Sequence, residues 1–197
     1  MLLNGVFFGV FTAGVYKSVA LNFLSDHVLT TAGAFGSICN GGSRIMWASL
    51  QDKYGFKKVY CVIMVLQLII SATTYYVRKD GTLYIIWVSI AFLCEGGHFS
   101  MFPTAAVKLF GIQNGGFLFT IMFFFIPLSS IIGFLIIQFG QDYISFEAVY
   151  QIAAGLSGLN LVLLYFFNEN EIISRATKKY NEKMMEQQNN VLKHVDK

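Results

Sequence analysis

The chain has 197 residues, a formal net charge of +3, 55% hydrophobic residues and 13% charged residues. This composition gives no support for nucleic-acid binding, and a soluble domain of this size would show helices with one apolar and one polar face. The apolar residues instead fall in blocks of about 20, the length that crosses a bilayer as a helix. The composition therefore predicts an all-α membrane protein.

Six such blocks follow one another along the chain. The predicted transmembrane helices are 2–24, 31–50, 59–77, 83–102, 115–139 and 148–167. The connections are short, so consecutive helices should be antiparallel neighbours. The final segment, 168–197, is rich in Glu, Lys, Asn and Gln and predicts a polar cytoplasmic tail. A solvated tail with partial helicity is the main expectation for it, and a weak amphipathic helix at the membrane surface is the alternative.

No enzyme signature occurs in the sequence. There is no phosphate-binding loop, no Gly-x-Ser-x-Gly and no His-Glu-x-x-His. Cys39, Cys61 and Cys94 lie in apolar segments without metal-ligand spacing, so we expect buried thiols rather than a disulfide framework or a metal site. An apolar stretch follows Met1 at once, which disfavours a cleavable signal peptide. We therefore expect neither catalysis nor a cofactor.

The distribution of basic residues predicts the orientation. If the N-terminus is inside, the cytoplasmic segments hold Lys53, Lys57, Lys58, Lys108 and the basic residues of the tail, whereas the opposite side holds Arg78 and Lys79. Loops rich in Lys and Arg stay on the cytoplasmic side. Both termini should therefore be cytoplasmic.

Two basic residues lie inside predicted helices. An arginine near the middle of a membrane helix costs at least about 2.5 kcal/mol, so Arg44 needs a partner or a watery cavity. A guanidinium matches carboxylate oxygens with two bonds, so Arg44 with Asn40 predicts an anion site. The alternative is a structural ion pair or a contact to backbone carbonyls. Lys17 either extends its stem to the membrane surface or lines the same substrate cavity.

Glu95 and His98 lie one helical turn apart in the fourth predicted helix. A carboxylate and an imidazole in an apolar path form a candidate proton relay. The alternative is a pair in contact with water at the cytoplasmic mouth.

Several small residues and prolines predict close contacts or flexible points. Gly5-x-x-x-Gly9 is typical of a helix–helix contact. Gly96 and Gly97 are candidate points of flexibility. Pro103 should end the fourth helix, and Pro127 should kink the fifth.

The segment Asp52-Lys53-Tyr54-Gly55-Phe56-Lys57-Lys58 resembles a family motif. It is similar to the loop between the second and third helices of each six-helix half in the major facilitator superfamily, with Ala48 in place of the leading glycine. Asn40, Gly41, Arg44, Trp47 and Asp52 also resemble the eighth helix of its oxalate/formate antiporter and monocarboxylate transporter branch, with departures at Ser43, Ala48 and Gln51. Segments 94–103 and 110–115 resemble the tenth helix and the loop after it.

This resemblance implies the C-terminal six-helix half of a secondary transporter for a small organic anion such as a monocarboxylate, an antiporter or a symporter with protons as a candidate coupling ion. Arg44 would occupy the anion-binding position, and Asp52, Lys53, Gly55, Lys57 and Lys58 would form a cytoplasmic gate loop. Segment 115–139 lacks the second basic residue of oxalate-type members, which argues against a dianion.

A single half exposes its cavity to lipid, so we expect a partner: an N-terminal half or a second copy of the chain. The alternative is a non-transporting membrane module, a degenerate half that acts as a receptor, scaffold or assembly partner. A six-helix pore is less favoured because no predicted helix carries a continuous polar stripe.

Overall fold

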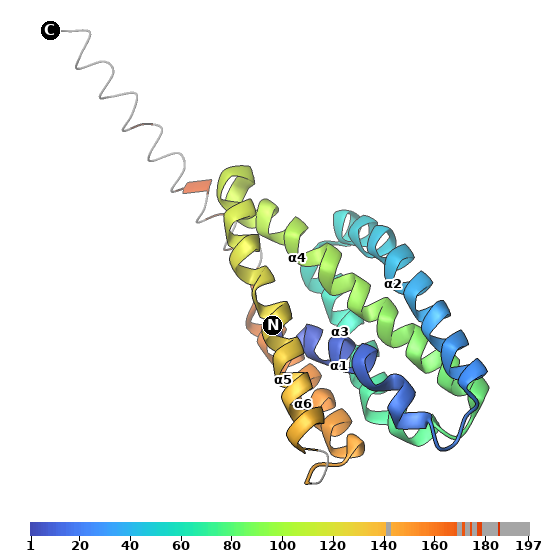
Figure 1. Cartoon of the computed structure of the whole chain (residues 1–197). Helices are drawn as coiled ribbons and strands as arrows, with labels where there is room; N and C mark the ends of the chain where they lie inside the picture. The colour runs from blue at the N-terminus through green and yellow to red at the C-terminus, as the bar shows by residue number, and fades with distance from the viewer. Residues whose placement is uncertain (141–142, 169–170, 172–173, 175–176, 179–184, 186–197) are drawn as a thin grey trace, which may run out of the picture.

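The computed structural model describes residues 1–140 and 143–168, together with 171, 174, 177, 178 and 185. This part of the chain forms the helices α1 (Leu2–Ala20), α2 (Asp26–Tyr54), α3 (Phe56–Val77), α4 (Gly81–Phe123), α5 (Phe125–Gly140) and α6 (Phe146–Phe166) (Figure 1). The predicted all-α fold class is confirmed. The predicted tail lies largely outside the described residues.

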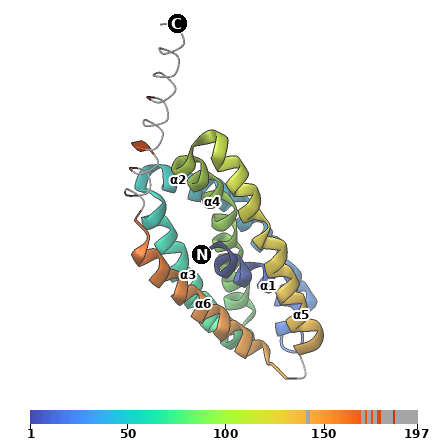
Figure 2. The same ribbon diagram turned by 90° about the vertical axis from the view of Figure 1, so that its left-hand side faces the viewer.

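The helices pack around α1. It touches each of the other five, while α2 runs along α4 and α3 runs along α6. Figure 2 shows α3 and α6 side by side, with α1 between this pair and α5. Residues of α1 therefore face the polar groups of α4 on one side and the α3–α6 pair on another.

Five stretches of the described chain are long and apolar enough to cross a membrane. They are Leu2–Ala20, Phe56–Val77, Gly81–Gly111, Asn114–Phe139 and Phe146–Phe166. The protein is thus an integral, multi-pass membrane protein. The helix α2 has 29 residues but is not in this set. Its middle is polar and glycine-rich, from Asn40 to Arg44.

The turn between α2 and α3 consists of a single glycine. Gly55 has φ 86° and ψ 159°, a conformation that residues with a side chain rarely adopt. Its N–H donates to the Gln51 carbonyl at 2.9 Å. The helix α2 therefore continues past residue 50, where the sequence analysis ended it, and α3 follows at once.

The expected helix end at Pro103 is wrong. The helix α4 continues through Pro103, and non-helical backbone appears at Gly111, with φ 78° and ψ 165°. The chain then turns back on itself (Figure 1), so that a Cβ on Gly115 would fall 2.6 Å from the Val107 Cα. A proline removes one helical hydrogen bond, whereas the glycine adopts a backbone angle that reverses the chain.

The interruption in the next segment falls at Phe124, between α4 and α5. Pro127 lies in the first turn of α5 and has no N–H to give to the carbonyl of Phe123. The Phe124 N–H bonds to the Ile121 carbonyl at 3.2 Å, the spacing of a tighter turn. The segment Asn114–Phe139 thus consists of two helical pieces joined near its middle.

Gly96 and Gly97 let α2 approach α4 closely. A Cβ on Gly96 would meet the Ser43 hydroxyl and the Asn40 carbonyl, and one on Gly97 would lie 3.0 Å from the Trp47 ring. Both glycines lie within continuous helix. The structure uses them for packing, and their predicted flexibility stays a prediction.

Candidate functional site

Arg44 lies on the exposed side of α2 and is held by its own helix and by α4. Its Nε and Nη2 atoms donate to the Asn40 Oδ1 atom at 3.3 and 3.0 Å, across one helical turn. Its Cζ atom lies 4.8 Å from the centre of the Phe99 ring, a cation–π distance. The guanidinium is therefore oriented, but its outer side stays open.

Asn40 also contacts Glu95. Its Nδ2 atom donates to the Glu95 Oε2 atom at 3.1 Å. In the described part of the chain, Arg44 and Glu95 form no direct ion pair, because the Asn40 amide lies between them. The side chain of Glu95 is buried, with 7% of its surface exposed. Asn40 is thus a bridge between a cation on α2 and a carboxylate on α4.

The helix α1 covers Glu95 at Gly9. A Cβ on Gly9 would fall 2.7 Å from the Glu95 Cβ and 3.0 Å from its Cδ. One turn earlier, a Cβ on Gly5 would fall 2.6 Å from the His98 Cε1. The Gly5-x-x-x-Gly9 pair therefore lies where α1 meets the two titratable residues of α4.

His98 belongs to a different cluster. Its Nε2 atom lies 2.8 Å from the Gln67 Oε1 atom, and the Gln67 Nε2 atom donates to the Gly5 carbonyl and the Ser157 hydroxyl, each at 3.0 Å. Since Gln67 Oε1 accepts, Nε2 of His98 carries the proton. In the described residues, Glu95 contacts α2 and His98 contacts α3, and no hydrogen bond joins them. Their role as a proton relay stays a prediction.

Sequence reasoning missed Gln67 and Asn160. Gln67 ties α3 to α1, α4 and α6, and the Asn160 Nδ2 atom donates to the Met1 carbonyl at 3.0 Å. The available signal was an amide in the middle of an apolar segment, which needs a partner inside the protein. Among the described residues, no three His, Cys, Asp or Glu side chains gather as metal ligands.

Lys17 lies far from Arg44. Its Nζ atom contacts the Asp26 Oδ1 atom at 3.2 Å and the Thr30 hydroxyl at 3.1 Å. Along α2, Thr30 and Arg44 are separated by about 21 Å at a rise of 1.5 Å per residue. Lys17 and Arg44 therefore cannot hold the same small carboxylate in this conformation.

Lys17 lines a hollow of about 430 Å³ between α1, α2 and α4. Its lining consists of Ala13, Tyr16, Lys17, Thr30, Gly33, Ala34, Ser37 and Phe92. Thr30, Ala34 and Ser37 share the exposed side of α2 with Arg44 at helical spacing. This helical spacing of small and polar residues is a second signal in the sequence for the side of α2 that carries Arg44.

The predicted gate loop makes two separate connections. The Asp52 Oδ1 atom lies 2.7 Å from the Lys108 Nζ atom, so the end of α2 is tied to α4. The Lys57 Nζ atom donates to the carbonyls of Tyr165 and Phe167 at 2.9 and 2.8 Å, which places a cation at the C-terminal end of α6. Lys108 thus pairs with the gate loop, a contact that its expected cytoplasmic position alone did not indicate.

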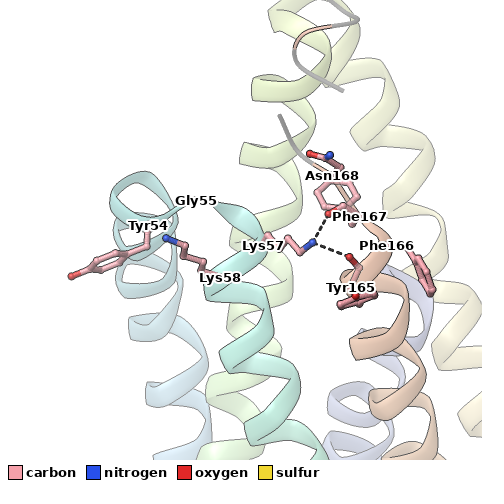
Figure 3. Close-up of a pocket in the computed structure, with 8 residues that line it drawn as sticks. All are labelled: Tyr54, Gly55, Lys57, Lys58, Tyr165, Phe166, Phe167 and Asn168. Atoms are coloured by element: carbon pink, nitrogen blue, oxygen red, sulfur yellow. Dashed lines mark hydrogen bonds between the residues drawn. The ribbon is translucent and has the colours of Figure 1, made fainter. Parts of the chain in front are cut away.

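Lys57 and Lys58 also line a hollow of about 610 Å³ (Figure 3). Its residues are Tyr54, Gly55, Lys57, Lys58, Tyr165, Phe166, Phe167 and Asn168. Figure 3 shows Lys57 extended toward α6, whereas Lys58 points toward Tyr54. Lys53 lies over the Tyr54 ring, 5.2 Å from its centre. The loop lysines thus have different surroundings, and Lys57 acts as a tie between α3 and α6.

A comparison with known families shows to which family a chain with this architecture belongs. The family model described as "Major Facilitator Superfamily" matches residues 1–188. The chain belongs to this superfamily. The resemblance drawn from the loop motif is thereby confirmed. The expectation of a carrier rather than an enzyme is confirmed with it.

Three relatives accord with the branch suggested by the α2 sequence. Apicoplast pyruvate carrier 1 of Toxoplasma gondii is 33% identical over 128 residues, which are 61% of this chain and 23% of that protein. Apicoplast pyruvate carrier 2 of the same organism is 29% identical over 104 residues, 52% of this chain and 16% of the carrier. The oxalate:formate antiporter of Oxalobacter formigenes is 29% identical over 99 residues, 48% of this chain and 24% of the antiporter. The chain thus matches about a quarter or less of each relative.

Proposed function

We propose that this major facilitator chain forms one six-helix half of a secondary transporter that carries a small organic monocarboxylate by alternating access. The observation that supports it most is the oriented and open guanidinium of Arg44. A carboxylate can take two parallel bonds from such a group. Gly41 and Gly42, next to Arg44, have no other atoms within 4 Å of a built Cβ, so a ligand can approach the backbone there.

The charge of the site favours a monoanion. Arg44 is its cation, Glu95 is a nearby carboxylate, and Lys17 of α1 bonds to Thr30, about four helical turns from Arg44 along α2. A dianion held by Arg44 would place two negative charges beside Glu95, with one positive charge to offset them. The named substrates of the relatives include a monocarboxylate, pyruvate, as well as oxalate and formate.

The exposed side of α2 needs a cover inside a membrane. Arg44 is on this side, and polar groups that face lipid are unfavourable. A second six-helix half, either an N-terminal half or another copy of this chain, would enclose the site. In this assembly both termini are cytoplasmic, and the Asp52–Lys108 pair is a latch at the cytoplasmic end.

Uptake of labelled pyruvate into liposomes tests the proposal, with the chain reconstituted by itself and fused to an N-terminal half. Arg44→Ala should weaken the apparent affinity roughly 10- to 100-fold, since a hydrogen bond to a charged group contributes about 1.5–3 kcal/mol. Arg78→Ala is the matched control, because Arg78 donates to the Tyr75 carbonyl away from the site. Unchanged uptake in Arg44→Ala would remove the site assignment. No uptake by the folded protein in any arrangement would favour a non-transporting module.

A further inference from the structure

We infer that Glu95 takes up the proton that accompanies anion binding at Arg44, and that Asn40 couples the two events. This inference rests on the proposed function and names its coupling ion and its proton acceptor. It assigns the proton to Glu95 and not to the neighbouring His98.

The first step is the connection through Asn40. Its Oδ1 atom accepts both bonds from the guanidinium, and its Nδ2 atom donates to Glu95. A carboxylate ligand on the open outer N–H groups of Arg44 adds a negative charge to the guanidinium that Asn40 Oδ1 contacts. The ligand and Glu95 are therefore linked through one guanidinium and one amide.

The second step is the charge of the site. Without a ligand, the charges of Arg44 and an ionised Glu95 sum to zero. A bound monocarboxylate would bring the sum to −1, and an uncompensated charge inside a membrane protein costs several kcal/mol. One proton from water, bonded to a carboxylate oxygen of Glu95, returns the sum to zero. The expected stoichiometry is one proton for each anion.

The third step concerns the other groups around Glu95. From α2 it faces Arg44 and Asn40, and from α1 it faces Gly9, which carries no charge. On α4, His98 is one turn away and bonds to Gln67 of α3. Lys17 of α1 is paired with Asp26 at the distant end of α2.

Glu95 is buried, and its carboxylate faces the side of the helices on which Arg44 lies. The helix α1 closes the side of its stem at Gly9, while Oε2 bonds to Asn40 on the side of the exposed Arg44. A proton therefore reaches Glu95 from the same side of the helices as the anion. This shared access is what coupling in one site requires.

The test measures protons and anions together in the complete, reconstituted transporter. Pyruvate is added in weak buffer with a pH indicator, and bound label is counted. The wild type should take up about one proton per pyruvate, and its affinity should fall about tenfold per pH unit once Glu95 is ionised. Glu95→Gln should bind pyruvate with no proton uptake and no such pH dependence. In liposomes it should keep pyruvate exchange and lose accumulation driven by a proton gradient.

Two variants serve as comparisons. Glu147→Gln removes a carboxylate that bonds to Tyr76 on the outer side of α3 and should keep the wild-type stoichiometry. His98→Gln should keep it too. If Glu95→Gln does not fold, Glu95→Asp retains a carboxylate at this position and should keep one proton per pyruvate.

The outcomes separate this inference from the proposed function. Pyruvate binding by the wild type without proton uptake overturns the inference and leaves the proposed function standing. Proton uptake that persists in Glu95→Gln, or that is lost in His98→Gln with binding intact, assigns the proton elsewhere and overturns it. Neither binding nor uptake of pyruvate by the wild type overturns both.

Discussion

At the scale of single residues, the absent side chain of Gly9 allows the burial of Glu95. The carboxylate stem fills the space that a Cβ would occupy, and α1 lies directly against it. Gly14 is on the same helix, but no other atoms lie within 4 Å of its built Cβ. The two glycines therefore have the same local structure and opposite surroundings.

This contrast gives a matched prediction. Gly9→Ala should lower the free energy of unfolding by about 1–3 kcal/mol, the usual cost of overpacking, and should disturb proton coupling, because Glu95 must move. Gly14→Ala should be neutral or stabilising, since alanine is the better helix former by about 1 kcal/mol. Thermal unfolding in detergent compares the two variants. Equal effects would show that the Gly9–Glu95 contact does not constrain the helix.

At the scale of helices, the chain changes direction where a glycine adopts an angle that other residues avoid. Gly55 and Gly111 have φ of 86° and 78°, and they are the positive-φ residues of the described chain. One separates α2 from α3, and the other lets the last part of α4 fold back on the part before it. Two single residues thus determine two changes of direction of the chain.

Gly111 and Gly116 allow this effect to be isolated. Both have open space around a built Cβ, and they differ in that Gly111 has a positive φ. Gly111→Ala should therefore destabilise the protein by about 1–3 kcal/mol through backbone strain, whereas Gly116→Ala should not. Thermal unfolding of the two variants under the same conditions measures the difference. A smaller loss of stability in Gly111→Ala than in Gly116→Ala would contradict backbone strain at residue 111.

The sequence predicted the helical class and the family, because apolar blocks and the Asp52–Lys58 motif are local patterns. It misplaced the break near Pro103, because a proline signals a missing bond, whereas the conformation of Gly111 depends on the fold around it. It also grouped Glu95 with His98 by their spacing. Which neighbour each one meets depends on the rotation and packing of α1, α2 and α3, which a single sequence does not specify.

At the scale of the whole molecule, the described chain has one side packed and another open. The α3–α6 pair is tied by Lys57 and by the bond between Tyr76 and Glu147. The segment Asn114–Phe139 is the most apolar of the candidate spans and is largely exposed. Arg44 lies on the exposed side of α2, which is also part of the open side of the described chain. In the proposed transporter, the α3–α6 pair would be a rigid unit, and α2 and α5 would meet lipid and a second half.

The Asp52–Lys108 pair tests the proposed movement. Both side chains are well exposed, at 63% and 43%, so the pair should contribute less than about 1 kcal/mol to stability. Asp52→Asn should therefore leave thermal unfolding almost unchanged. If the pair is a latch, the same variant should alter the transport rate several-fold.

Asp26→Asn is the control, because Asp26 forms the other exposed ion pair of the described residues, with Lys17. Transport rates and unfolding temperatures are measured for both variants. A change of rate as large in Asp26→Asn as in Asp52→Asn would contradict a special role for the loop.

The polar middle of α2 has a consequence for synthesis. Its Ser43 and Trp47 donate to the Leu93 carbonyl, and its Asn40 donates to Glu95, so its polar partners lie on α4. The ribosome completes α2 and α3 before it reaches α4, and helices with an arginine near their centre insert poorly by themselves. We expect α2 to remain loosely held at the translocation channel until α4 emerges and draws it into the bilayer. The residues that form the transport site would then also set the order in which the protein is assembled.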